Sequence, residues 1–252
     1  MRPIRIVART LILLWTVAQA VLDFLWRRLR SGKKISARER AEWLHYWCRK
    51  GLPRLNIHFS TEGEPPAKGL LVANHLSYLD IIILSAISPC VFVSKREVGS
   101  WPIFGFMSRM AGTIFVDRAR PAETRPAQDE MRRRLSEGLT VVLFPEATSS
   151  DGTTVLPFRS SLFEAAVGAG AEISAARIRY QVSDGQPETD VCYWGEMTFL
   201  PHVVKLFSKR QVTGYVRFGE RPYCFTDRKE AARRMYEEVL ALGEKRPLVS
   251  AV

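Results

Sequence analysis

A histidine and an aspartate five positions apart, His75 and Asp80, are the side chains in this sequence best suited to acid–base chemistry. A carboxylate that accepts a hydrogen bond from one imidazole nitrogen fixes the tautomer and leaves the other nitrogen free as a general base. Five residues of an ideal helix turn through about 140° net, so the pair cannot share one helix face. The two can meet if His75 precedes a helix and Asp80 lies in its first turn. Ser77 to Asp80 is an S-x-x-D sequence, which predicts Ser77 as the N-cap. Spacing alone leaves a second interpretation, in which Asp80 only caps a helix and His75 only fills a turn.

Two further segments place polar side chains directly after apolar runs. Residues 144–150 carry Glu146, Thr148 and Ser149, a carboxylate and hydroxyls that suit a polar headgroup. An ordinary turn explains the same loop equally well. The other segment, residues 112–118, is a predicted strand that ends in Asp-Arg, for which a surface salt bridge is the simpler explanation.

Short apolar runs that alternate with helical stretches must position these side chains. The pattern predicts an α/β fold, with a mixed, largely parallel sheet flanked by helices. Reactive residues then lie at the carboxyl ends of strands, as His75 and Glu146 do. The predicted strands are residues 70–73, 90–94, 113–116, 140–144, 172–180 and 212–218, and the predicted helices are 80–86, 125–137, 163–167 and 236–242.

The basic character of the chain is concentrated at its N-terminus. Residues 1–50 contain twelve Lys or Arg and three Asp or Glu, which is +9 of the total net charge of +11. Residues 11–26 form an apolar run flanked by arginines, and residues 37–50 place Trp43, Tyr46 and Trp47 among basic side chains. Aromatic rings beside cations suit the headgroup region of a membrane.

Four interpretations fit the apolar run. Its sixteen residues, interrupted by Asp23, are short for a spanning helix, which needs roughly 20 apolar residues. A cleaved signal peptide fits poorly, because apolar sequence continues to Trp26 past the small-residue triplet at Ala18–Ala20. A buried helix is the plain alternative. We favour one or two helices that lie in one leaflet, and therefore divide the chain into a membrane-anchoring helical segment, 1–52, and a second domain, 53–252.

Composition excludes several other classes. The four cysteines, Cys48, Cys90, Cys192 and Cys224, are far apart, which argues against a disulfide scaffold and a zinc knot and suits a reducing compartment. The four histidines lack the spacing of metal ligands, so we expect no metal. The near-neutral body and the apolar N-terminal run oppose a nucleic-acid-binding protein.

The three polar segments, taken in order, resemble the first three motif blocks of the glycerolipid acyltransferase family, which includes the lysophosphatidic acid acyltransferases. Those blocks are N-H-x-x-x-x-D, G-x-x-F-[IV]-x-R and F-P-E-G-T-R-S. They correspond here to Asn74, His75 and Asp80, to Gly112, Phe115, Val116 and Arg118, and to residues 144–150. The resemblance covers roughly residues 68–180, and Lys95 with the residues that follow it is also similar to the family.

Three departures bear on the acceptor. Ala147 replaces the usual Gly of the third block, and Ser149 replaces an Arg that the family associates with phosphate-containing acceptors. Ser174 to Ile178 replaces the usual Val-Pro fourth block. Two stretches, 150–162 and 194–202, are similar to the branch that acylates lyso-ornithine lipid.

The resemblance implies transfer of a fatty acyl group from acyl-CoA or acyl carrier protein to a lysophospholipid hydroxyl, with no cofactor. The acceptor expected first is 1-acyl-sn-glycerol-3-phosphate, with lyso-ornithine lipid or another lysolipid as the alternative. His75 and Asp80 are the expected catalytic residues, at the cytoplasmic face of the inner membrane, with monotopic or single-pass attachment. A non-catalytic lipid-binding protein is the alternative of another class. The expected substrate-binding residues are Asn74, Lys95, Arg118, Glu146, Thr148 and Ser149.

Overall fold

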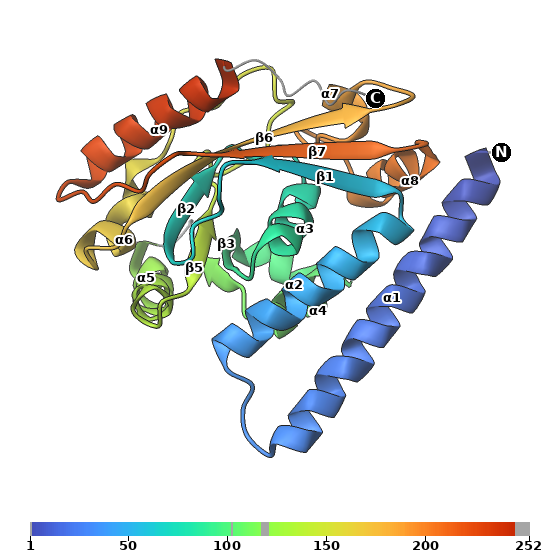
Figure 1. Ribbon diagram of the computed structural model, residues 1–252, viewed down its shortest axis with the longest axis horizontal. Helices are drawn as coiled ribbons and strands as arrows, with labels where there is room; N and C mark the ends of the chain where they lie inside the picture. The colour runs from blue at the N-terminus through green and yellow to red at the C-terminus, as the bar shows by residue number, and fades with distance from the viewer. Residues whose placement is uncertain (1, 102, 117–120, 245–252) are drawn as a thin grey trace.

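The computed structural model describes residues 2–101, 103–116 and 121–244. Within them, seven strands form one sheet in the order β1-β7-β6-β2-β5-β3-β4 (Figure 1). The strands are β1 (Ile57–Glu62), β2 (Gly69–Ala73), β3 (Val91–Lys95), β4 (Ile114–Val116), β5 (Thr140–Leu143), β6 (Ile173–Val182) and β7 (Val212–Phe218).

Helices precede the sheet and connect its strands. The α-helices are α1 (Arg2–Ser31), α2 (Ala37–Arg54), α3 (Tyr78–Ile87), α4 (Phe104–Ala111), α5 (Pro121–Ser136), α6 (Glu164–Gly168), α7 (Pro187–Asp190), α8 (Phe199–Ser208) and α9 (Arg228–Glu244), and the 3₁₀ turns are η1 (Arg96–Ser100) and η2 (Ser160–Phe163).

Strand direction divides the sheet into two parts. β6, β2, β5, β3 and β4 pair in parallel, whereas β7 is antiparallel to β6 and parallel to β1. The predicted mixed, largely parallel sheet is therefore confirmed. The edge strand β1 was not predicted, because only Ile57 and Phe59 of its six residues are apolar, which is too short a pattern to identify a strand.

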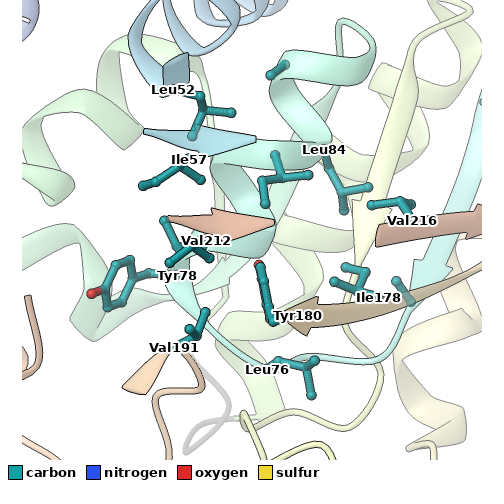
Figure 2. Packing of buried hydrophobic residues seen from close by; sticks show 14 of the residues in the cluster. Leu52, Ile57, Leu76, Tyr78, Leu84, Ile178, Tyr180, Val191, Val212 and Val216 are labelled. Carbon is teal, nitrogen blue, oxygen red and sulfur yellow. The ribbon is translucent and has the colours of Figure 1, made fainter. Parts of the chain in front are cut away.

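The two faces of the sheet carry separate hydrophobic cores. Along β2, alternate side chains enter opposite cores, Leu71 on one face and Leu70 on the other, because successive strand residues point to opposite sides. α2, α3 and α8 contribute to the first core, and α5, α6 and α9 to the second. Figure 2 shows the first core, with Leu52 and Ile57 on one side and Tyr180 and Val191 on the other.

α1 and α2 pack beside each other at the edge of the domain, and α1 also contacts α8 (Figure 1). Arginines of this segment bind carbonyl groups at the ends of other helices. The buried Arg9 donates to the carbonyl of Phe207 in the last turn of α8 and to those of Lys209 and Arg210 just after it. Arg40 donates to the carbonyl of Met110, in the last turn of α4. A cation at a helix C-terminus satisfies orphan carbonyls and complements the helix dipole.

The suggestion that the aromatic rings of residues 37–50 suit the headgroup region does not hold for either tryptophan, because both are buried. Trp43 is fully buried, and its indole N–H donates to the Ala20 carbonyl at 3.1 Å. Trp47 donates to Asp23 at 2.9 Å. The two rings pack α2 against α1, so Asp23 is a hydrogen-bond acceptor within the fold. Tyr46 is exposed.

Candidate active site

His75 and Asp80 meet in the way that their spacing allows. The helix α3 begins at Tyr78 with Ser77 as its N-cap, and His75 lies in the turn between β2 and this helix. His75 Nδ1 and Asp80 Oδ2 are 2.8 Å apart. Asp80 is fully buried, whereas the His75 side chain retains 21% of its exposure. This geometry assigns the Nδ1 proton to the bond with Asp80 and leaves Nε2 as the free, basic nitrogen.

The turn that carries His75 is held by side chains on both sides. Asp80 Oδ2 also accepts the backbone N–H groups of Leu76 and Ser77, at 2.7 and 3.0 Å. Asn74 donates to the carbonyl of Ile178 on β6 and accepts its N–H, which extends the β2–β6 ladder by one residue. Both polar atoms of the Asn74 amide are thus bonded to the Ile178 backbone, which holds the end of β2 against β6.

Glu146 holds the same turn from the neighbouring strand. Because β2 and β5 are adjacent and parallel, their carboxyl ends bring His75 and Glu146 together. Glu146 Oε1 accepts the His75 N–H at 2.7 Å, and Oε2 accepts the Leu156 N–H at 2.9 Å. Burial raises the pKa of Glu146 to about 6, although these N–H donors oppose the shift. With both oxygens on backbone donors, Glu146 positions His75.

The imidazole of His75 stacks on Phe144, with ring centroids 4.1 Å apart. His75 lines a cavity of about 400 Å³ between α1, α2, α3, α4 and α8. Most of its wall is apolar, so it suits a hydrocarbon chain. Lining side chains include Leu13, Val17, Leu44, Leu52, Leu79, Ile82, Phe104, Met107, Val203 and Leu206.

The remaining residues expected to bind substrate fall into two groups, those that line the cavity and one that the structure does not describe. Lys95, Thr148 and Ser149 line the same cavity as His75. Lys95 and Thr148 are exposed, whereas the Ser149 hydroxyl donates to the carbonyl of Tyr193. Arg118 lies outside the described residues. Among those described, no cluster of three His, Cys, Asp or Glu side chains is arranged to hold a metal ion.

The aromatic residues behind and beside the His75–Asp80 pair were not predicted from the sequence. Tyr180 on β6 donates to Asp80 Oδ1 at 2.6 Å. Tyr78 bonds to the buried His202 at 3.0 Å, and His202 Nε2 bonds to the Cys192 carbonyl. Burial lowers the pKa of His202, which favours the neutral ring. Tyr180 is 100 positions from Asp80, and His202 is 124 positions from Tyr78, so no local spacing could have identified these pairs.

Ala147 adopts a left-handed backbone conformation with φ of 64°, at the position where the family usually has Gly. A Cβ in this region costs about 1–2 kcal/mol. We expect Ala147→Gly to stabilise the protein by up to about 1 kcal/mol, because the relieved strain exceeds the entropy that Gly adds to the unfolded chain. Urea unfolding measures the change. The matched control is Ala169→Gly, since Ala169 has φ of −91°, and this substitution is expected to destabilise. Destabilisation by both would contradict the argument.

Comparison with known proteins identifies the relatives of this chain. The acyltransferase family model matches residues 54–179. A lyso-ornithine lipid O-acyltransferase of Brucella abortus is 37% identical over 187 residues, covering 69% of this chain and 70% of that protein. A 1-acyl-sn-glycerol-3-phosphate acyltransferase of Neisseria gonorrhoeae is 40% identical over 123 residues, 49% of this chain and 48% of that protein.

The fold has a counterpart among solved structures. The crystal structure of a 1-acyl-sn-glycerophosphate acyltransferase from Thermotoga maritima matches with a TM-score of 0.66 at 20% identity, over 98% of this chain and 100% of that one. Sequence and fold together define the class of protein: this chain is an acyltransferase. Within that class it belongs to the family that the three motif blocks predicted, whose members include acyltransferases named for lyso-ornithine lipid and for 1-acyl-sn-glycerol-3-phosphate.

Proposed function

We propose that this enzyme moves a fatty acyl group from an acyl thioester, acyl-CoA or acyl carrier protein, directly to the hydroxyl of a lysolipid. The observation that carries this proposal is the His75–Asp80 pair at the wall of an apolar cavity. The cavity offers room for the acyl chain, and the polar residues Thr148 and Ser149 line it together with His75.

In the proposed reaction, His75 Nε2 removes the proton from the acceptor hydroxyl as its oxygen attacks the thioester carbonyl carbon. The new ester C–O bond forms, the C–S bond breaks, and the proton passes from the imidazolium to the departing thiolate. Asp80 orients the imidazole and stabilises its positive charge. Glu146 and Asn74 fix the backbone that carries His75, and Lys95 pairs with an anionic group of the substrate.

We place lyso-ornithine lipid first among acceptors, ahead of 1-acyl-sn-glycerol-3-phosphate. The relative named for lyso-ornithine lipid matches more of the chain than the one named for 1-acyl-sn-glycerol-3-phosphate. Ser149 takes the place of a cation, and its hydroxyl is occupied by the Tyr193 carbonyl. Among the described residues, Lys95 is the only Lys or Arg lining the cavity. As a single point charge, Lys95 balances one carboxylate fully but a dianionic phosphate monoester only in part.

A panel of acceptors tests this assignment. With labelled acyl-CoA and acyl carrier protein as donors, we expect lyso-ornithine lipid to be acylated with the higher kcat/KM. Ser149→Arg is expected to raise the ratio of phosphate-acceptor to ornithine-acceptor turnover by about tenfold, since a charged hydrogen bond contributes about 1.5–3 kcal/mol. Ser149→Ala is the control and should leave that ratio unchanged. Preference for the phosphate acceptor by the unaltered enzyme would reverse the order proposed here.

The N-terminal helices, residues 1–52, are proposed as the membrane anchor of an acyltransferase domain formed by residues 53–252. α1 is long and apolar enough to cross a bilayer by length and composition. Attachment to one leaflet fits better than a spanning helix, because one side of α1 packs on the domain while the other is exposed. We place this attachment at the cytoplasmic face of the inner membrane. The exposed apolar residues of α1 are Ile4, Val7, Leu11, Leu14, Trp15, Leu22, Leu25, Trp26 and Leu29.

A further inference from the structure

Tyr180 lies in the first hydrophobic core and contacts Asp80 of the His75–Asp80 pair from that side. Its ring is surrounded by apolar side chains of the core, with Ile178, Val191 and Val212 nearby in Figure 2. Its hydroxyl donates a 2.6 Å hydrogen bond to Asp80 Oδ1. Tyr180 and Asp80 are 100 positions apart in the chain, on β6 and α3.

The two carboxylate oxygens of Asp80 accept different numbers of hydrogen bonds. Oδ2 accepts three bonds, from His75 Nδ1 and from the N–H groups of Leu76 and Ser77. Oδ1 accepts a bond from Tyr180 and from no other residue in the described part of the chain. Because Asp80 is fully buried, water cannot replace that donor. Bonds on both oxygens restrict rotation of the carboxylate, so the Tyr180 hydroxyl helps to keep Oδ2 aimed at His75.

We propose that Tyr180 is a positioning residue for acyl transfer, which acts through Asp80 by holding the carboxylate in the orientation that His75 requires. The proposal rests on the function proposed for His75 and Asp80. It separates Tyr180 from the other aromatic residues near the site. Tyr78 bonds to His202, and Tyr193 lines the cavity wall, whereas the Tyr180 hydroxyl is bonded to the dyad itself.

Tyr180 is suited to this task because it stays protonated. Burial first, and then the charge of Asp80, raise its pKa well above the ordinary tyrosine value. The hydroxyl therefore remains a donor wherever Asp80 is ionised. Phenylalanine preserves the ring, and with it the packing against the core, so Tyr180→Phe removes the donor and little else.

Kinetics of Tyr180→Phe test the proposal. We expect kcat to fall about 10- to 100-fold, the range for loss of a hydrogen bond to a charged group, while KM for donor and acceptor stays within about twofold. The matched control is Tyr215→Phe on β7, whose hydroxyl bonds to Gln181 at 2.8 Å on the exposed side of the sheet. This control should retain the unaltered kcat. Rates are normalised to the folded fraction measured by circular dichroism.

A double-mutant cycle with Asp80→Asn distinguishes positioning from a general structural role. If Tyr180 acts through the carboxylate, Tyr180→Phe should cost less than about threefold in the Asp80→Asn background. The ¹⁵N resonances of the His75 ring supply a readout independent of turnover, and Tyr180→Phe should shift them whereas Tyr215→Phe should not. Full activity of Tyr180→Phe, or the same loss in both backgrounds, would overturn the proposal. Turnover by His75→Ala would instead refute the function proposed for the dyad.

Discussion

Replacement of His75 by alanine is expected to lower kcat for acyl transfer by about 10²- to 10⁴-fold, the usual contribution of a positioned general base. The loss should appear in kcat, because the imidazole takes a proton only as the ester bond forms, while the apolar cavity that binds the acyl chain is unchanged. The measurement is the initial rate of labelled ester formation at saturating donor and acceptor. Binding to liposomes should be unaffected, since His75 lies away from the exposed face of α1.

The matched control is His58→Ala. His58 is exposed on β1 and bonds to Asn56 at 2.9 Å, far in the sheet order from the turn that carries His75. It should retain full activity, which excludes a general effect of removing a histidine. Normal turnover by His75→Ala, with the control also active, would contradict the assignment of the general base.

The contact between His75 and Asp80 could be predicted because its geometry is local. Ser77 and Asp80 specify a helix start, and the helix start brings Asp80 to His75. The resemblance to known motif blocks then separated this arrangement from an ordinary cap. Residues that support the pair from a distance, Tyr180 and His202, gave no comparable signal, because their contacts depend on the order of strands and helices around the sheet.

Strands were predicted where burial on both faces makes a continuous apolar run, as in β2 and β5. β1 was not predicted because its last three residues are all polar, which leaves only Ile57 and Phe59 as an apolar pattern. α8 was not predicted because it is only ten residues long and follows a polar loop. α9 is longer than the predicted helix 236–242, since its first turns are charged and exposed on one side. The predicted helix 163–167 corresponds to α6, which begins one residue later, and a 3₁₀ turn precedes it.

Part of the positive charge in residues 1–50 is bound within the protein and is not free to contact lipid. Arg9 and Arg40 are committed to carbonyl groups after α8 and in α4. Arg38 reaches the carbonyls of Glu137 and Gly138, just after α5. These contacts fix α1 and α2 on the domain. Apolar burial must then supply more of the membrane affinity than charge does.

Substitution of Leu11, Trp15 and Leu22 together by glutamine is therefore expected to lower partitioning onto phosphatidylcholine–phosphatidylglycerol vesicles by at least about 100-fold. These side chains are 61%, 65% and 66% exposed on α1. Burial of a large apolar side chain contributes about 1.5–3 kcal/mol, so three of them exceed the change that this ratio requires. Glutamine favours helix and is neutral, so helicity and the attraction to anionic lipid are both preserved. Vesicle flotation measures the change.

Leu240→Gln on α9 is the matched control, because this leucine is also exposed but lies on the opposite face of the sheet from α1. It should float with vesicles as the unaltered protein does. The triple variant should still acylate a short-chain lysolipid presented as monomers, because none of the three residues lines the cavity. Unchanged flotation of the triple variant would mean that α1 is not the membrane-binding surface. Loss of turnover on the monomeric acceptor would mean that this face of α1 supports the active site itself.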